Sequence, residues 1–285
     1  MPQPLRQIKN RIRSIENTKK VTSVMELVSV SKLNRIEKIR DALRPYQAGL
    51  RLLIDSLISS KPEEIDNLFF KNREKKKLVL CVITSDNGLC GLYNVNIIRA
   101  ADEFINKNGS DKVKLIVVGK KGLNYFNSKK FKILRAYVGL NGRYDDIISD
   151  QICSILKNLF LTGEADEVYV AYSRFEVGAF NKVMVEKFVN IEKPAQGKEI
   201  KYIFEPDFES ILKEALTKYI IIKMRLIFLE AFSSEHTARS ISMHAATDNA
   251  KELLEGLILL KNKVRQANIT QEIMEIISSV EALKG

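Results

Sequence analysis

The residues of this 285-residue chain that could do chemistry are few, and the best candidates lie in a central glycine-bearing stretch. Ser85 to Gly91 reads Ser-Asp-Asn-Gly-Leu-Cys-Gly and stands between an expected strand and an expected helix, where exposed N–H groups often bind phosphate. It lacks the spacing and the Lys-Ser/Thr pair of a Walker loop, and it is not a GxGxxG motif. Gly119 to Gly122 follows another strand without an upstream glycine at P-loop spacing. We interpret both stretches as strand-to-helix turns in preference to phosphate sites.

Single residues that could act in catalysis have no evident partners. Cys90 has no histidine near it in the sequence, which favours a buried or half-buried thiol over a nucleophile. His236 and His244 are eight residues apart, just over two helical turns, which is too far to chelate one metal, so we expect solvated helix positions. The remaining carboxylates form no general acid and base pair: Asp86, Asp145 and Asp146. No catalytic site, cofactor or metal is therefore expected.

Composition narrows the class of protein. Apolar residues make up 45% and charged residues 28%, which is typical of soluble globular proteins and excludes wholesale disorder. The three cysteines are far apart without a CxxC pair, so a disulfide framework or a zinc cage is not expected. No stretch approaches the roughly 18 to 20 apolar residues of a membrane span. Any membrane association must go through partners.

The net charge of +11 lies mainly near the N-terminus. Residues 1–60 hold twelve Lys and Arg against five Asp and Glu, which suggests an acidic partner such as nucleic acid, anionic lipid or clustered protein carboxylates. Aromatic residues do not interleave with these charges, which disfavours nucleic acid. The early basic residues also resemble an organelle-targeting peptide, but the periodic pattern runs on past Glu16, so we assign the segment to the mature protein.

Both ends of the chain read as long helices. After Pro206, residues 207–284 contain one glycine and no proline, and Asp207 is a good N-cap. In residues 1–60 a heptad seam is made by Ile36, Ile39, Leu43, Tyr46, Leu50, Leu53 and Leu57. Pro45 lies inside this seam and should kink or restart the helix. In the same register the seam turns polar between residues 16 and 35.

The middle of the chain predicts an α/β domain. Strands are expected at residues 78–84, 114–118, 132–134, 167–172 and 183–189, with helices at 94–106, 121–128 and 144–160. This order predicts a Rossmann-like domain with a mainly parallel sheet, inserted between the arms of a long antiparallel two-helix coiled coil. The predicted domains are residues 1–60, 75–195 and 207–285.

The two helices differ in length, so the C-terminal one should overhang by roughly 20 residues, or about 30 Å. That end carries an apolar stripe with no intrachain partner. Its members are Ile269, Ile273, Ile276, Ile277, Val280 and Leu283. A sleeve supplied by a partner would cover it.

Five segments resemble the γ subunit family of F-type ATP synthases. Residues 12–28 (Ile-Arg-Ser-Ile-Glu-Asn-Thr-Lys-Lys-Val-Thr-Ser-Val-Met-Glu-Leu-Val) are similar to its opening helix, and residues 245–250 (Ala-Ala-Thr-Asp-Asn-Ala) and 265–273 (Arg-Gln-Ala-Asn-Ile-Thr-Gln-Glu-Ile) to its last helix. The central Ser85 to Gly91 stretch and residues 204–207 (Phe-Glu-Pro-Asp) match as well. The resemblance covers nearly the whole chain.

The resemblance implies a rotary shaft that couples proton-driven rotation of the membrane c-ring to conformational cycling of catalytic β subunits, in ATP synthesis or hydrolysis. The implied partners are three α and three β subunits around the coiled coil, with ε and the c-ring at a globular foot. The chain would be a non-catalytic subunit, peripheral on the cytoplasmic face of a bacterial cell membrane.

The resemblance also implies contact residues. Those toward β are Met25, Arg265, Gln266, Thr270, Glu272 and Glu275. Tyr202 and Glu205 would lie in the foot, on the c-ring and ε side. Two other readings remain open: a coiled-coil nucleic-acid binder, and an α/β enzyme with helical arms.

Overall fold

The computed structural model of the chain describes residues 3–60, 68–70, 74, 76–176, 179–189 and 204–282. Packing divides it into two compact units, residues 1–28 with 240–285 and residues 29–239. The helices are α1 (Gln3–Ser60), α2 (Tyr93–Asn108), α3 (Lys120–Ser128), α4 (Asp146–Leu161) and α5 (Phe208–Ala282), with short 3-10 turns at Leu68–Phe70 and Ser110–Lys112. The strands are β1 (Leu78–Ile83), β2 (Val113–Val118), β3 (Ile133–Tyr137), β4 (Glu167–Glu176) and β5 (Ala179–Lys187).

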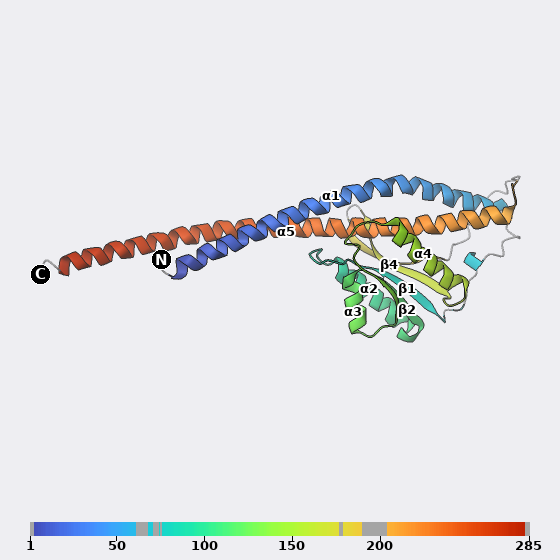
Figure 1. Cartoon of the computed structure of the whole chain (residues 1–285), viewed down its shortest axis with the longest axis horizontal. Helices are drawn as coiled ribbons and strands as arrows, with labels where there is room; N and C mark the ends of the chain where they lie inside the picture. Colours follow the sequence, from blue (N-terminus) through green and yellow to red (C-terminus); the bar gives the residue numbers. More distant parts are fainter. Residues whose placement is uncertain are drawn as a thin grey trace. The chain divides into compact units, whose positions relative to one another are not determined.

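The second unit is built on a five-stranded sheet of order β3-β2-β1-β4-β5. β1 pairs in parallel with β2 and with β4, and β2 pairs in parallel with β3. Only β5, which follows β4, runs antiparallel to its neighbour. The expected mainly parallel α/β sheet is thus confirmed, and Figure 1 shows its strands between α2 and α3 on one side and α4 on the other.

Each face of the sheet carries its own core, because alternate residues of a strand point to opposite faces. Leu80 and Val82 pack in the core with α2 and α3, where Tyr93 and Phe126 are fully buried. Cys81 and the other odd-numbered β1 residues face a larger core, which α4 shares with residues 36–58 of α1 and 208–232 of α5. These stretches of the two long helices therefore pack as part of the α/β body.

Helix ends are fastened by side chains at two positions. Asp145 accepts hydrogen bonds from the backbone N–H groups of Ile147 (2.9 Å) and Ile148 (3.2 Å) at the start of α4. Asp207 accepts one from Ser210 N (2.8 Å) and caps α5, as expected from the sequence. Pro45 does not restart the first helix, since α1 is continuous through it.

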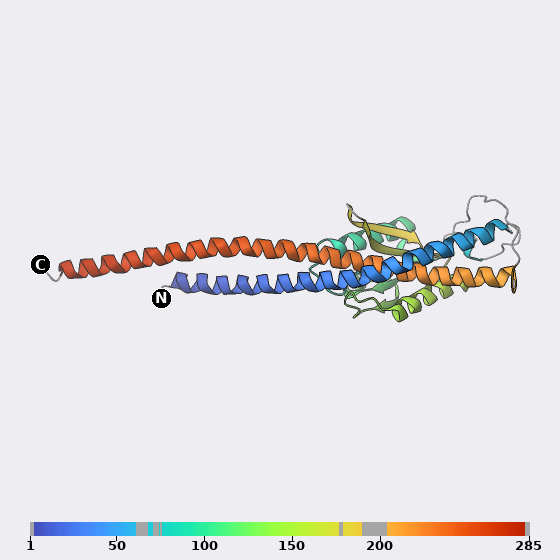
Figure 2. The ribbon, with the colours of Figure 1, turned by 90° about the horizontal axis from the view of Figure 1, so that it is seen from above.

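The first compact unit is an antiparallel helix pair. The hydroxyls of Thr22 on α1 and Thr247 on α5 meet at 2.7 Å, and both residues are buried, so the polar part of the seam is matched across the pair. Leu5 and Leu254 are buried in the same unit. Figures 1 and 2 both show the C-terminal end of α5 running on past the N-terminal end of α1.

Candidate functional site

The Ser85 to Gly91 loop is a closed turn whose polar groups bond to one another. Ser85 N donates to Asn94 Oδ1 (2.9 Å), and Ser85 Oγ donates to Asn87 O (2.6 Å). Asn94 Nδ2 donates back to Ser85 Oγ (2.8 Å) and contacts the Cys90 sulfur (3.2 Å). The N–H and the hydroxyl of Ser85 are thus already bonded within the loop and are not free to bind a phosphate. This agrees with the interpretation of the loop as a structural turn.

Asp86 fastens three loops at the carboxyl ends of the parallel strands. Its Oδ1 accepts hydrogen bonds from Lys120 N (3.0 Å) and Gly139 N (3.1 Å), and its Oδ2 accepts one from Asn141 N (2.7 Å). Lys120 is the first residue of α3, so the carboxylate lies at a helix N-terminus. Open α/β sheets commonly bind their ligands at this edge. In this protein the carboxylate of Asp86 is the anion bound at this edge of the sheet.

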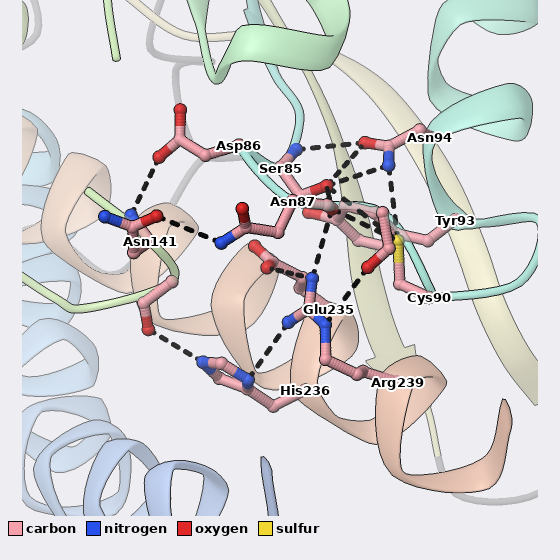
Figure 3. A network of polar contacts seen from close by, with 12 residues as sticks. Ser85, Asp86, Asn87, Cys90, Tyr93, Asn94, Asn141, Glu235, His236 and Arg239 are labelled. Atoms are coloured by element: carbon pink, nitrogen blue, oxygen red, sulfur yellow. Dashed lines mark hydrogen bonds and ion pairs between the residues drawn. The ribbon is translucent and has the colours of Figure 1, made fainter. Parts of the chain in front are cut away.

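A buried polar cluster lies where α5 meets the loop (Figure 3). Arg239 Nη2 pairs with Glu235 Oε1 at 2.8 Å and donates to Asn87 O at 3.2 Å, while its Nε donates to Gly88 O at 3.4 Å. Burial raises the pKa of the Glu235 carboxyl, and the guanidinium of Arg239 opposes that shift. The ion pair thus compensates a carboxylate that is only 1% exposed.

His236 belongs to the same cluster, so the expected solvated position for it is wrong. The residue is 1% exposed, and its Nε2 faces the Gly142 carbonyl at 2.7 Å and must donate to it. Nδ1 then accepts from Arg239 Nη1 at 3.4 Å, which assigns the neutral Nε2–H tautomer. Burial lowers the pKa of the imidazole to about 4. His244, by contrast, is exposed and pairs with Glu26 at 3.0 Å.

None of the three thiols is a poised nucleophile. Cys81, Cys90 and Cys153 are all buried. Burial raises the pKa of Cys81 and of Cys153 to about 12, and it also raises that of Cys90. Across the described ranges, no three or more His, Cys, Asp or Glu side chains are grouped to hold a metal ion. Within the same ranges, no helix has the length and apolar character to cross a membrane.

Residues expected to contact β lie on the two helices of the first compact unit. Met25 is half-buried on α1, and Arg265, Gln266, Thr270, Glu272 and Glu275 are exposed on α5. Thr270 Oγ1 bonds to Gln266 O (3.0 Å) within the helix, and Glu275 accepts from Gln271 Nε2 (3.0 Å). Both bonds lie within the exposed end of α5.

The expected apolar stripe at the end of α5 is exposed throughout its described part. The exposed fractions are 48% for Ile269, 51% for Ile273, 64% for Ile276, 49% for Ile277 and 46% for Val280. Leu283 lies outside the described residues, as does Tyr202 of the expected foot. Glu205, also expected there, is exposed just before α5.

Comparison with known proteins identifies the family. A family model described as ATP synthase matches residues 4–283. The ATP synthase gamma chain of Protochlamydia amoebophila is 38% identical over 287 residues, covering 98% of this chain and 99% of its own length. That of Moorella thermoacetica is 35% identical over 281 residues, with 98% and 99% covered.

The chain belongs to the ATP synthase gamma chain family. Its function is that of the central shaft, the rotary part of a membrane-associated ATP synthase, and it is a subunit of that ATPase complex.

Solved structures show the same fold. A chain of the Euglena gracilis mitochondrial ATP synthase (OSCP/F1/c-ring) superposes with a TM-score of 0.69 at 16% identity, covering 99% of this chain and 95% of its own. A chain of the Tetrahymena thermophila central stalk and c-ring structure gives 0.60 at 21% identity, covering 79% and 99%.

Sequence reasoning missed the Glu235 and Arg239 pair of this gamma-chain family member. A signal was present, since two opposite charges four residues apart border the nearly apolar run Leu226 to Phe232. Charges at that spacing are ordinarily read as a solvated i,i+4 pair. Their burial follows from the sheet and loops that pack on this part of α5.

Proposed function

We propose that this gamma chain is a non-catalytic rotor shaft whose C-terminal tip turns inside a sleeve of three α and three β subunits. The α/β body is the foot that meets ε and the c-ring. The observation that carries the proposal is the exposed apolar stripe of α5. Ile269 to Val280 keep roughly half of their surface in water, and full burial of such a side chain is worth about 1.5 to 3 kcal/mol. A surrounding apolar sleeve would recover part of this free energy.

Rotation of the shaft can change the catalytic sites because one asymmetric shaft stands inside a ring of three equivalent sites. A single asymmetric helix pair presents different faces to three β subunits, so it stabilises a different conformation in each of them. Turning the shaft exchanges these conformations. Proton flow is then coupled to ATP synthesis because the shaft binds the different conformations of a β subunit with different affinities.

The proposed β contacts combine charge with exposure at one end of a helix. Arg265, Gln266, Thr270, Glu272 and Glu275 lie within three turns of α5 and are all solvent-exposed. Exposed polar side chains distributed around a helix end suit hydrogen bonding to loops of a surrounding sleeve.

On the opposite helix, the N-terminal part of α1 carries the larger positive charge of the chain, which suits acidic β loops. Met25 would face such a loop. Tyr202 and Glu205 would contribute to the foot.

We propose further that the complex lies on the cytoplasmic face of a bacterial cell membrane. Bacterial gamma chains that match over nearly their whole length support this location. The chain would reach the membrane through its partners.

The first experiment purifies the native complex through an affinity tag on this chain and measures its subunit ratio by native mass spectrometry. One copy of this chain to three α and three β subunits is expected. A ratio of one to one would refute the sleeve, because an axle cannot be as numerous as the subunits around it.

A charge variant tests the Met25 contact in membrane vesicles. Met25→Lys should lower ATP-driven proton pumping more than ATP hydrolysis, because a new cation beside β carboxylates would hold the shaft. Asn34→Lys adds the same charge at an exposed position of α1 outside the proposed contacts and should leave the ratio unchanged. If the ratio of proton pumping to ATP hydrolysis were the same in both variants, Met25 would not be a β contact.

A further inference from the structure

The stretch of α5 that passes through the α/β body is enclosed. Every residue from Leu226 to His236 is buried, so this part of the helix has no solvent-facing side. Two hydrogen bonds tie it directly to the α/β body. Tyr93 Oη on α2 donates to Ala231 O (3.1 Å), and the hydroxyls of Ser173 on β4 and Ser234 meet at 2.8 Å. Apolar burial resists separation of the helix from the body, but it is non-directional.

The Arg239 cluster adds directional bonds at the last residue of this compact unit. The guanidinium holds two successive carbonyls of the Ser85 to Gly91 loop, those of Asn87 and Gly88, and its ion pair with Glu235 fixes its own orientation. Among the described residues, the second carboxylate oxygen of Glu235 receives no hydrogen bond, which leaves Arg239 as the donor that compensates it. His236 holds the neighbouring loop through Gly142 O.

The two loops are themselves locked together. Asp86 joins the backbone of Gly139 and Asn141 to its own loop, and Asn87 Nδ2 donates to Asn141 Oδ1 at 3.0 Å. Lys32 Nζ on α1 donates to Asn141 O at 2.8 Å. The same pair of loops therefore grips α5 through Arg239 and His236 and α1 through Lys32.

We propose that this grip is a torque joint, in which Arg239 is a positioning residue that prevents the α/β body from twisting about the long helices. The inference rests on the proposed shaft function and adds the place where the body transmits rotation. A guanidinium fork bonded to two carbonyls and a carboxylate restrains both position and angle, whereas a single ammonium group does not. The joint has no ligand and takes no part in ATP chemistry.

The test measures torsional stiffness in the assembled complex. The α and β subunits are immobilised and the shaft is stopped by nucleotide. A bead is attached through a cysteine introduced at exposed Ser110, and its angular fluctuation is recorded. The variant is Arg239→Lys, which keeps a positive charge beside Glu235 but loses the fork. The angular variance should rise about twofold, because the bonds to Asn87 O and Gly88 O are lost.

Controls separate a joint from ordinary stabilisation. Lys213→Gln changes an exposed charge elsewhere on α5 and should leave the variance unchanged. Asn87→Ala, at an exposed position, removes the side-chain bond to Asn141 and keeps the Asp86 bonds between the two loops, so it tests the joint even where Arg239→Lys does not assemble. It should give a smaller rise in variance. Hydrogen exchange should show about tenfold lower protection of the 85–91 loop in Arg239→Lys.

The outcomes distinguish the joint from the shaft. Unchanged angular variance in Asn87→Ala and in assembled Arg239→Lys would overturn the joint while leaving the shaft intact. If the bead on the wild-type chain does not rotate with ATP, the shaft function fails first. A raised variance confined to these two variants supports the joint.

Discussion

Lowering the pH should destabilise this chain through His236. Its ring is buried, and in the folded state Nε2–H donates to Gly142 O while Nδ1 accepts from Arg239. The contact at Nδ1 requires the neutral ring, whereas the bond to Gly142 O can form in either protonation state. Burial lowers the imidazole pKa from 6.5 to about 4. Because the folded-state pKa lies below the unfolded one, the unfolded state binds more protons between these values. Stability from this group is complete above pH 6.5 and is lost as the pH falls toward 4.

The magnitude follows from the two pKa values. One unit of pKa difference corresponds to about 1.4 kcal/mol, so the shift from 6.5 to about 4 removes about 3 kcal/mol when both states are protonated. At pH 5, where the unfolded ring is already charged and the folded one is not, the loss is about 2 kcal/mol relative to pH 7.5.

Charged groups near His236 also change the pH dependence of stability, so the wild-type chain is compared with His236→Gln. Burial raises the pKa of Glu235, and that shift acts in the opposite direction because the folded state then takes up a proton more readily as the pH falls. Arg239 on the same helix and Lys32 on α1 also lower the pKa of the ring. All three groups remain in His236→Gln, whose amide can still donate toward Gly142 O but does not titrate.

The assay is urea unfolding of the purified full chain, followed by circular dichroism at pH 7.5, 6 and 5. The wild-type chain should lose about 2 kcal/mol more free energy of unfolding between pH 7.5 and 5 than His236→Gln does. Identical pH dependence of the two proteins would show that His236 is not held neutral by burial.

Three further predictions concern stability of the isolated chain. Gly142 has φ +65°, and a Cβ added there would lie 2.6 Å from the buried imidazole of His236, so Gly142→Ala should lower the free energy of unfolding in urea by about 2 kcal/mol. Gly109→Ala is the control: Gly109 has φ +91° and open space around it, so this variant measures the backbone strain alone. Asp145→Ala removes the cap of α4 and should cost about 1 kcal/mol in thermal unfolding, and an unchanged midpoint would contradict the capping role. Phe228→Ala, at 1% exposure, should cost about 3 to 5 kcal/mol, whereas Ile276→Ala, at 64%, should change stability by less than about 0.5 kcal/mol; a large loss for the second would mean that the tip is covered within the chain.

Periodicity alone predicted the strands, the connecting helices and the two long helices. The expected β1, β2 and α3 lie within a residue of their observed ends, because continuous β-branched runs and helical repeats are strong local signals. β3 extends to Tyr137, three residues beyond its expected end, where Arg135 and Ala136 pair with β2 despite weak strand preference. Pairing with a neighbouring strand overrides local propensity there.

The contacts between residues far apart in the sequence could not be predicted from the sequence pattern. Nothing local indicates that residues 226–236 of α5 are enclosed by the α/β body, so His236 was expected in solvent and Glu235 and Arg239 were not singled out. Asp86 illustrates the same limit. It lacks an acid–base partner in the sequence, but folding brings three backbone N–H groups from distant loops to its carboxylate. The exposed stripe at the tip was predicted because it depends only on helix lengths and periodicity.

The central claim is that this chain turns as a single shaft within fixed partners, and direct observation of rotation tests it. Cys81, Cys90 and Cys153 are buried, so a cysteine at exposed Ser110 can be labelled selectively with a bead while the α and β subunits are held on a surface. The account predicts that ATP drives the bead in one direction with three dwell positions per turn. A bead that only fluctuates about one angle, in a complex that still hydrolyses ATP, would contradict it.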